Sequence, residues 1–563
     1  MTPRQSVAVA PAPSLDTNRA ATAEILHELS LPLHPLALEQ RSTRAVIKDI
    51  AIALAVALVL RLPYFRGRLF PLNDGGMFAQ IIDNIRAAHF VFPTHTTYNF
   101  LDIPLSYPPL GFYLGALCTV VTGQSAVSVL TWLPLALNLL AVVVIYFIAK
   151  EVYPAGFYAC LAACCYASIG RSAEWLIMGG GLTRGLGMLF ASVAILLFVR
   201  SHKCDSMMLA AWSGVCVGLA VLSHLEGGIF AALSVIVLSV LLPKRFQNLQ
   251  FSLLAGIVSI AVVLPWVIWL YRHLGFGPLM NAAITGGAYY APLRWIPLSF
   301  LAASIIFAVI ARFPYVCWLT VIPWFLRRSG ATYSAAVAGL CMVWFVNAIM
   351  VLLVRRAAFF RRWRDALLVA LALTFSLQFS GLPQVRSDRL ADLRLNTRAQ
   401  VSPAELQGMQ AAVQLAPANT KFFVFDQRTS EWYEDMIAEW FPYFTQRQCV
   451  NTAQGREWLP NHAFFTAVDL SAALEFSLSS GVVKILDKLQ PDFIFVAGPF
   501  DEDHETIANT LRAYAKTAPI YKNSEVLIYK VERQTLATSG AEGVSTQATA
   551  IRATKPGASS AHP

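Results

Sequence analysis

One acidic residue, Asp74, stands in a turn between an apolar segment and a stretch with helical spacing. The turn reads Asn73-Asp74-Gly75-Gly76. A carboxylate in a pocket that lipid and aromatic side chains keep partly dry could act as a general base. An Asp before two glycines is also a common turn and helix cap, so both roles stay open. Asp83 and Asp102 follow in the same segment and are weaker candidates, since Asp83 also fits the polar face of the helix.

A second group of charged residues lies in 171–187, RSAEWLIMGGGLTRGLG, between two apolar runs. Charges at membrane depth are costly and usually face a cavity or a partner. Arg171 or Arg184 could hold a phosphate group, and the neighbouring glycines would let the backbone approach it closely. The alternative is an ion pair with Glu174, or side chains that extend to the lipid headgroups.

His224 and Glu226 lie in SHLEGGIF, where two apolar runs meet with almost no connection. They are two positions apart and so do not share one helix face, which predicts a turn. We expect a polar contact inside the membrane part, with a solvated helix end as the alternative. The stretch 272–297 is rich in Gly, Pro and aromatic residues and is predicted to be a mobile loop over a site, with Arg294 as a candidate.

Cofactor motifs do not occur in the chain. There is no HExxH, no Walker A and no GxGxxG. We therefore expect no cofactor and no tight metal site. A divalent ion held weakly by one carboxylate and substrate phosphates stays open.

The elements that must position these residues are mostly apolar. Of 563 residues, 56% are hydrophobic and 13% charged, and the net charge is +10. Soluble domains carry about 25% charged residues, so the composition excludes a soluble enzyme and a nucleic-acid-binding protein of the usual polar kind. Basic clusters between apolar runs, such as 355–364, indicate loops facing the cytoplasm.

Apolar segments long enough to cross a bilayer recur from residue 45 to residue 384. The predicted segments are 45–65, 107–123, 128–149, 153–169, 181–199, 206–223, 226–243, 249–271, 298–326, 331–354 and 366–384. They give about 11 to 13 spans, depending on whether 171–180 is a broken segment and 298–326 is divided. An odd count places the N-terminus in the cytoplasm and the C-terminal part outside the cell membrane.

The remaining regions differ in composition. Residues 1–44 are a polar tail, and 66–106 is a long loop with a surface helix over 77–88. Residues 385–532 alternate strand-like pieces (421–427, 492–498, 526–531) with a helix at 504–516, which predicts a soluble α/β domain. Within it, EWFPYFTQRQ is interpreted as core rather than as a docking surface. Residues 533–563 have the composition of a disordered tail.

The order of these features resembles the GT-C superfamily of polytopic glycosyltransferases, which includes protein O-mannosyltransferases and aminoarabinose transferases. The resemblance rests on Asn73-Asp74-Gly75-Gly76 with its helix, on Ser106-Tyr107-Pro108-Pro109-Leu110, and on the Gly-rich segments at 179–187 and 224–228. It implies a mainly α-helical polytopic membrane protein with a C-terminal soluble α/β domain. The family's acidic residue in the first external loop activates the acceptor, and Asp74 is the matching position. Asp83 and Tyr107 would support that loop.

The resemblance also implies a substrate class. The donor would be a sugar on a polyprenyl phosphate, transferred with inversion to an unknown acceptor, which is a protein, a lipid or a polysaccharide. Arg184, His224 or Arg294 would supply positive charge to the leaving phosphate. No WWDYG-type signature and no paired acid at Asp74 are present. The alternatives are a lipid or saccharide transporter or flippase, and a polysaccharide polymerase or ligase.

Overall fold

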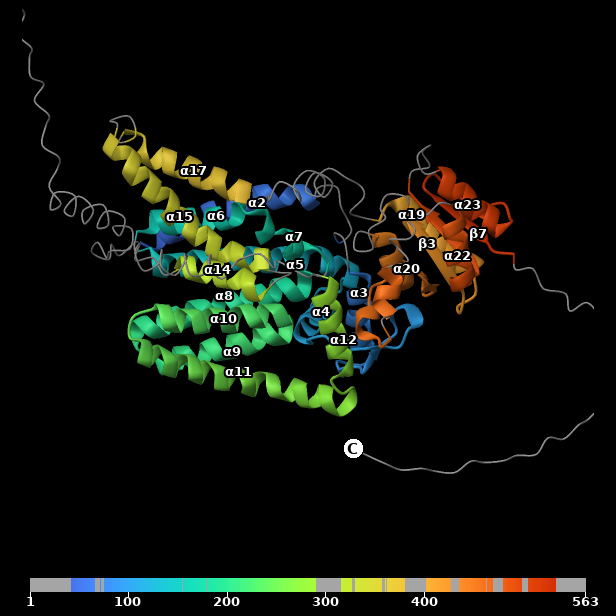
Figure 1. The fold of residues 1–563 in the computed structure, drawn as a ribbon, viewed down its shortest axis with the longest axis horizontal. Helices are drawn as coiled ribbons and strands as arrows, with labels where there is room; N and C mark the ends of the chain where they lie inside the picture. Colours follow the sequence, from blue (N-terminus) through green and yellow to red (C-terminus); the bar gives the residue numbers. More distant parts are fainter. Residues whose placement is uncertain are drawn as a thin grey trace, which may run out of the picture.

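The computed structural model describes most of the chain between residues 42 and 532. The described residues are 42–65, 71, 75–153, 155–179, 181–289, 315–326, 330–356, 360, 362–379, 401–426, 435–461, 463–468, 479–498 and 505–532. Figure 1 shows a bundle of long helices on one side and a sheet with its own helices on the other. A short stretch from the first loop lies between these two parts.

The bundle consists of the apolar segments. Its helices are α2 (Thr43–Phe65), α4 (Leu110–Thr122), α5 (Ala126–Val152), α6 (Gly156–Ser168), α8 (Gly181–Cys204), α9 (Met207–Ser223), α10 (Leu225–Leu241), α11 (Arg245–His273), α14 (Tyr315–Phe325), α15 (Gly330–Arg356) and α17 (Arg364–Phe379). They coincide with the predicted segments, except that 298–314 lies outside the described residues. Within the described chain, α5, α8, α11 and Thr332–Val351 of α15 are long and apolar enough to cross a membrane.

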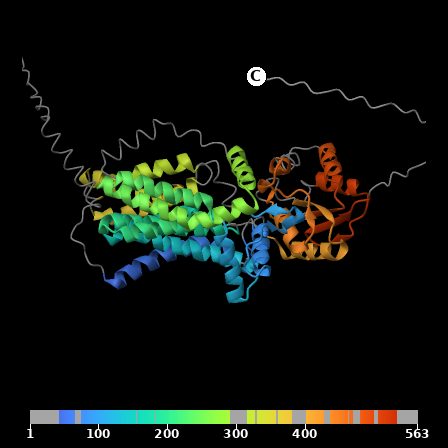
Figure 2. The same ribbon diagram turned by 90° about the horizontal axis from the view of Figure 1, so that it is seen from below.

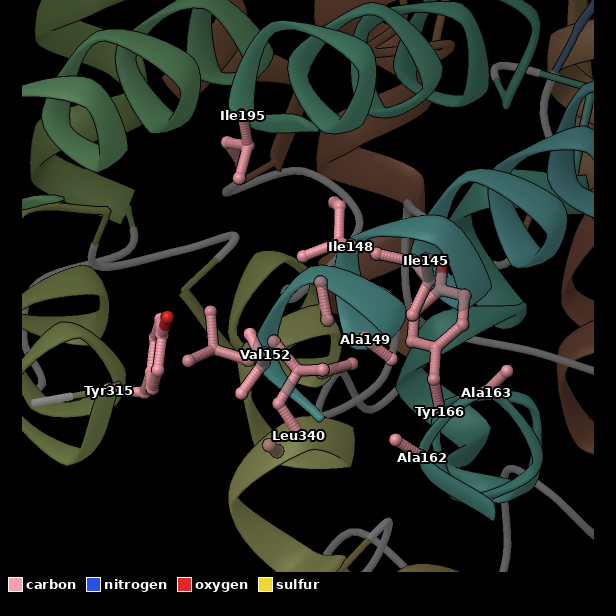
Figure 3. Packing of buried hydrophobic residues seen from close by; sticks show 14 of the residues in the cluster. Ile145, Ile148, Ala149, Val152, Ala162, Ala163, Tyr166, Ile195, Tyr315 and Leu340 are labelled. Carbon is pink, nitrogen blue, oxygen red and sulfur yellow. The ribbon is translucent and has the colours of Figure 1, made fainter. Parts of the chain in front are cut away.

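Small residues let the bundle helices approach closely, as is usual inside membranes. A Cβ on Gly214 of α9 would lie 2.3 Å from the Ala255 carbonyl oxygen of α11. A Cβ on Gly339 of α15 would lie 2.9 Å from the Tyr166 backbone nitrogen of α6. Figure 3 shows the resulting core, in which side chains from α5, α6, α8, α14 and α15 interlock.

A buried arginine fixes the segment before α8. This segment forms two short turns, η3 (Gly170–Ser172) and α7 (Glu174–Ile177). Arg61 of α2 donates to Asn138 of α5, to the carbonyl oxygens of Ala57 and Ala167, and to Ser172 Oγ at 3.0 Å. Asn138 Nδ2 donates in turn to the Ser172 carbonyl oxygen at 2.7 Å. A fully buried guanidinium is tolerated here because its donors are satisfied by oxygen atoms.

The first loop contains the predicted surface helix. This is α3 (Gly76–Ala87), whose apolar face, Phe78, Ile81, Ile82 and Ile85, is buried. A hairpin of β1 (His95–Thr96) and β2 (Ile103–Pro104) follows, with the turn η2 (Tyr98–Phe100) between its strands. Asn84 attaches the helix to the hairpin, because its Oδ1 accepts from Thr96 Oγ1 and from the Thr97 backbone N–H.

The C-terminal part is built on a five-stranded sheet. Its elements are α19 (Pro403–Leu415), β3 (Lys421–Asp426), α20 (Met436–Thr445), β4 (Gln448–Cys449), η5 (Arg456–Trp458), α22 (Ser479–Leu489), β5 (Phe493–Ala497), α23 (Glu505–Ala515), β6 (Tyr521–Lys522) and β7 (Val526–Lys530). The strand order is β4-β3-β5-β7-β6, with β4, β3 and β5 parallel and β7 antiparallel to both neighbours. The predicted strands and the predicted C-terminal helix are confirmed.

The central strands are apolar on both faces because both faces are covered. Phe422 and Val424 of β3 share a core with α19, α20 and the first-loop helix. Phe423 and Phe425 point to the other face, where α22 and α23 pack. Successive side chains of a strand alternate between the two faces, so one sheet faces the first loop on one side and its own helices on the other.

The prediction of a loop over 272–297 is wrong in its described part. Residues Gly277–Tyr289 form helix α12, which packs against η5. Leu279 and Ala282 of this helix lie partly buried against the core shared by the first loop and the sheet. Apolar residues at helical spacing therefore outweigh the Gly content that suggested a loop. Arg294 lies outside the described residues.

Candidate functional site

Asp74 itself lies outside the described residues, but the backbone directly after it is well defined. Gly75 is the N-cap of α3 with φ 151°, a conformation that favours glycine. Gly75 and Gly76 are both buried. In the sequence, Asp74 directly precedes this N-cap.

The predicted residue His224 forms the centre of a polar group in the bundle. It occupies the junction of α9 and α10, which is a single residue with extended backbone rather than the turn predicted from the two-residue spacing. Its Nδ1 lies 3.2 Å from the hydroxyl of Tyr333 of α15. Its ring lies 6.3 Å from the ring of Tyr107, at the end of the first loop.

Arg184 and Glu226 complete this group. Both lie within electrostatic range of the Tyr333 hydroxyl, as does the Tyr107 side chain. Arg184 also lies over the ring of Trp175, at 5.2 Å from the centroid. We name Tyr107, Arg184, His224, Glu226 and Tyr333 the Tyr333 cluster.

Glycines allow the helices of the cluster to meet. A Cβ on Gly187 of α8 would lie 3.0 Å from His224 Cβ, and one on Gly227 of α10 would lie 3.1 Å from the Gly187 backbone. The Gly-rich pattern in this region therefore brings the helices together, and the same close packing brings Arg184 of α8 and Glu226 of α10 near Tyr333. The sequence pointed to these residues but gave no sign of Tyr333, which stands alone in an apolar helix.

Tyr107 joins the cluster to the first loop and to the C-terminal part. Its hydroxyl lies 3.4 Å from Thr183 Oγ1. Its ring meets the ring of Phe78 of α3 edge-on, with 5.4 Å between the ring centroids. The centroid of the Trp458 ring of η5 lies 5.6 Å away. One side chain thus touches the loop helix, helix α8 and the sheet part, which places the cluster where all three meet.

Arg171 is placed differently. Its guanidinium pairs with Glu174 at 3.2 Å, the arrangement considered as the alternative from the sequence. Asp83 also lies away from the cluster and accepts a hydrogen bond from the Tyr443 hydroxyl of α20 at 2.9 Å. Burial, and then the charge of Asp83, raises the pKa of Tyr443 above its ordinary value.

The first loop and the sheet meet in an interface that the sequence did not predict. Glu439 Oε1 of α20 accepts from the backbone N–H groups of Gly75 and Gly76, at 2.7 and 3.1 Å. The Tyr98 hydroxyl donates to the Glu439 carbonyl oxygen at 2.6 Å. Gln446 Nε2 donates to Gln80 Oε1 at 3.1 Å. The loop–sheet interface is defined by these contacts, the Tyr443–Asp83 bond and the Asn99 pair that follows.

Asn99 pairs with the edge strand of the sheet. Its Nδ2 donates to the Cys449 carbonyl oxygen at 2.9 Å, and its Oδ1 accepts from the Cys449 N–H at 2.7 Å. The amide imitates a neighbouring strand, which satisfies one residue of an edge that would otherwise stay open. EWFPYFTQRQ, which includes residues 439–445 of α20, is thus both core and contact surface for the loop, and its interpretation as core alone is incomplete.

The described residues show no group of three or more His, Cys, Asp or Glu side chains that could hold a metal ion. The Tyr333 cluster instead combines one guanidinium, one imidazole and phenol hydroxyls near a carboxylate. Such a set can donate hydrogen bonds to an anionic group. The carboxylate of Glu226 limits the positive charge that the cluster carries.

The sequence and the fold are similar to those of known membrane glycosyltransferases. Residues 106–269 match the family model described as dolichyl-phosphate-mannose-protein mannosyltransferase. The archaeal oligosaccharyltransferase AglB from Archaeoglobus fulgidus superposes with a TM-score of 0.53 at 14% identity, over 80% of this chain and 69% of AglB. ArnT from Cupriavidus metallidurans gives a TM-score of 0.48 at 12% identity, over 86% of this chain and 98% of ArnT. No curated protein sequence matches the chain.

Proposed function

Since this chain has the GT-C fold of polytopic membrane glycosyltransferases, as its sequence led us to expect, we propose that it transfers a sugar from a polyprenyl-phosphate-linked donor. The acceptor would be a hydroxyl or amine of a protein, lipid or polysaccharide at the outer face of the cell membrane. Asp74 would act as the general base and the transfer would invert the anomeric carbon. The alternative, a lipid or saccharide transporter or flippase, is an outcome of the test below.

The observation that carries this proposal is the position of the Tyr333 cluster. It lies inside the bundle and is linked through Tyr107 to the loop that contains Asp74. A donor with a polyprenyl chain stays in the bilayer, so its phosphate must be met at the membrane face while the acceptor approaches from the loop side. AglB, which shares the fold, was solved with a dolichol-phosphate and an inhibitory peptide.

In the proposed reaction, the first loop supplies the general base and the bundle supplies the groups that bind the leaving phosphate. The acceptor oxygen or nitrogen attacks the anomeric carbon as the bond from that carbon to the phosphate oxygen breaks. The acceptor's proton passes to Asp74, and the polyprenyl phosphate leaves with the bonding electron pair. Arg184 and His224 would stabilise the charge that develops on the leaving phosphate, where fixed donors act most strongly. Attack from the side opposite the phosphate gives inversion.

The two neutral hydroxyls of the cluster suit the same task. Tyr107 and Tyr333 can each donate one hydrogen bond to a phosphate oxygen. Tyr107 directly follows the first loop and precedes α4, so we expect it to move with the loop when an acceptor binds. Arg171 and Asp83 would support the structure rather than the reaction, and Arg294 stays a candidate for the donor phosphate.

The test is transfer of label from a mixture of radiolabelled polyprenyl-phosphate sugars in membrane vesicles. Wild type is compared with Asp74→Asn and with Asp205→Asn as a control at matched expression. Asp205 is exposed at the α8–α9 turn and pairs with Lys244 at 2.9 Å. We expect transfer by wild type and the control and loss in Asp74→Asn.

Two other results would change the assignment. Equal transfer by all three proteins would remove Asp74 from the mechanism. Movement of lipid-linked sugar across the vesicle bilayer, without transfer and regardless of Asp74, would favour the transporter.

A further inference from the structure

We propose that Glu439 is a positioning residue that fixes the start of α3, directly after Asp74 in the sequence, from the C-terminal part of the chain. The inference rests on the proposed function, because it assigns Glu439 a role through Asp74. It adds a contribution of the sheet part to the site. The contacts that carry it are those between α20 and the start of α3.

The first contact is a helix cap supplied from a distance. The first N–H groups of a helix have no partner within the helix and are normally capped by a nearby side chain. Gly75, the N-cap of α3, makes no side-chain cap bond. Glu439 Oε1 takes that place for Gly75 and Gly76, across 364 positions of sequence. A carboxylate also suits the positive end of the helix dipole.

The second contact is close packing that only glycine permits. A Cβ on Gly76 would lie 2.5 Å from the Glu439 carbonyl oxygen, and a Cβ on Gly75 would lie 2.8 Å from the Trp440 ring. The Gly75-Gly76 pair therefore has a reason beyond the turn itself. It lets α20 approach the backbone directly after Asp74.

The third contact shows that the capping helix is itself held firmly. Asp435 Oδ1 caps α20 by accepting from the Ala438 N–H at 2.9 Å. Tyr98 donates to the Glu439 carbonyl oxygen from the other side of the loop. Glu439 is 7% exposed, so solvent competes little for its carboxylate. The carboxylate therefore binds the loop from a fixed position.

The consequence for the reaction is specific. Two hydrogen bonds fix the peptide groups next to Asp74, so their loss would let the base move relative to the acceptor. A displacement of about 1 Å in a catalytic group can reduce a rate by about 100-fold. Donor binding should change little, because Arg184, Glu226 and Tyr333 of the cluster are positioned by the bundle helices α8, α10 and α15. The expected signature is a lower kcat with an unchanged KM for the donor.

The experiment compares Glu439→Ala, Glu439→Gln and Tyr443→Phe in the full-length protein in vesicles. Glutamine keeps a side-chain oxygen that can accept from Gly75 and Gly76. Tyr443→Phe removes a bond of the same helix to the same loop, at Asp83, and is the matched control. We expect kcat to fall about 10- to 100-fold in Glu439→Ala only, with donor KM changed less than about threefold.

Amide hydrogen exchange of a peptide spanning residues 71–85 is the second readout, and it needs no activity. Exchange of the Gly75 and Gly76 amides should be faster in Glu439→Ala and close to wild type in Glu439→Gln and Tyr443→Phe. Unchanged exchange and kcat in Glu439→Ala would overturn the proposal. Equal losses in all three variants would also overturn it, since Glu439 would then only hold the interface together.

The two proposals fail in different ways. If wild type transfers no sugar, or if Asp74→Asn is as active as wild type, the proposed function fails whatever the exchange of the loop shows. If Asp74→Asn is inactive while Glu439→Ala has the wild-type kcat, only the role of Glu439 fails.

Discussion

Arg184 is the residue whose proposed task depends most directly on its charge. It stacks on Trp175 and lies near Tyr333 with Glu226. Arg184→Gln keeps a polar side chain of moderate size but removes the charge. Because hydrogen bonds to charged groups contribute about 1.5–3 kcal/mol, we expect kcat/KM for the donor to fall about 10- to 100-fold.

The matched control for Arg184 lies on the same helix. Arg200 of α8 pairs with Glu151 at 2.9 Å, sixteen positions away from Arg184 along the chain. Arg200→Gln should leave donor kinetics unchanged in the same transfer assay. Equal losses in both variants would mean that α8 needs its charges for stability and not for the donor.

The residues of the site differ in how far the sequence could predict them. Arg184, His224 and Glu226 are recognisable because charges between apolar runs need a reason. Tyr333 and Arg61 are not, because each lies inside an apolar helix and takes its role from partners far along the chain. Glu439 was hidden for a similar reason, since a single Glu in a soluble part has no pattern that shows which distant N–H groups it will cap.

Among the elements, the start of α3 offers the sharpest test of packing. Gly76→Ala places a Cβ 2.5 Å from the backbone of Glu439, which cannot rotate away. Overpacking of this kind costs about 1–3 kcal/mol, so the thermal unfolding temperature in detergent should fall and transfer should weaken. Gly256→Ala is the control, because its Cβ would have open space in α11. A drop in both variants, or in neither, would contradict the close contact between α3 and α20.

Elements with a regular spacing of apolar residues were predictable from the sequence. Elements whose role depends on contacts with distant segments were not. Apolar runs gave the bundle helices, and Phe-rich strands such as β3 and β5 stood out because both faces of the sheet are covered. Helix α12 was missed because Gly and Pro residues obscured its apolar spacing. The dual role of α20 was missed because a helix buried against a neighbouring part of the same chain has the composition of ordinary core.

At the scale of the whole molecule, the loop–sheet interface should weaken in alkaline solution. Burial, and then the charge of Glu439, raises the pKa of Tyr98, and burial raises the pKa of Cys449 to about 12. Burial, and then the charge of Asp83, raises the pKa of Tyr443 as well. Groups with a raised pKa contribute stability that is complete below their ordinary pKa, near 8.5 for Cys and 10 for Tyr. That stability is lost as the pH rises toward the folded-state values.

The measurement is exchange or thermal unfolding between about pH 8 and pH 11. Wild type should lose stability across this range, first through Cys449 and then through the tyrosines. Tyr443→Phe should start less stable and lose less, since it has one group fewer to ionise. A stability that stays constant up to pH 11 would contradict the burial of these groups.

Figure 2 shows the sheet part against the loop end of the bundle. Tyr107 and Trp458 are in contact although one ends the first loop and the other belongs to η5. The GT-C fold could be expected from the sequence, but its assembly around this contact could not. Short polar contacts between distant segments leave no periodic trace in either segment.

The distance between Gly75 and Glu439 along the chain also affects the order of events during protein synthesis. A ribosome adds about 5–20 residues per second, so α3 exists for roughly 20–70 s before its capping carboxylate is made. The bundle can assemble during that interval, but the Gly75 and Gly76 N–H groups at the start of α3 lack their Glu439 cap until α20 has been made. If Glu439 has the proposed positioning role, a chain cut short before α20 is expected to lack full transfer activity.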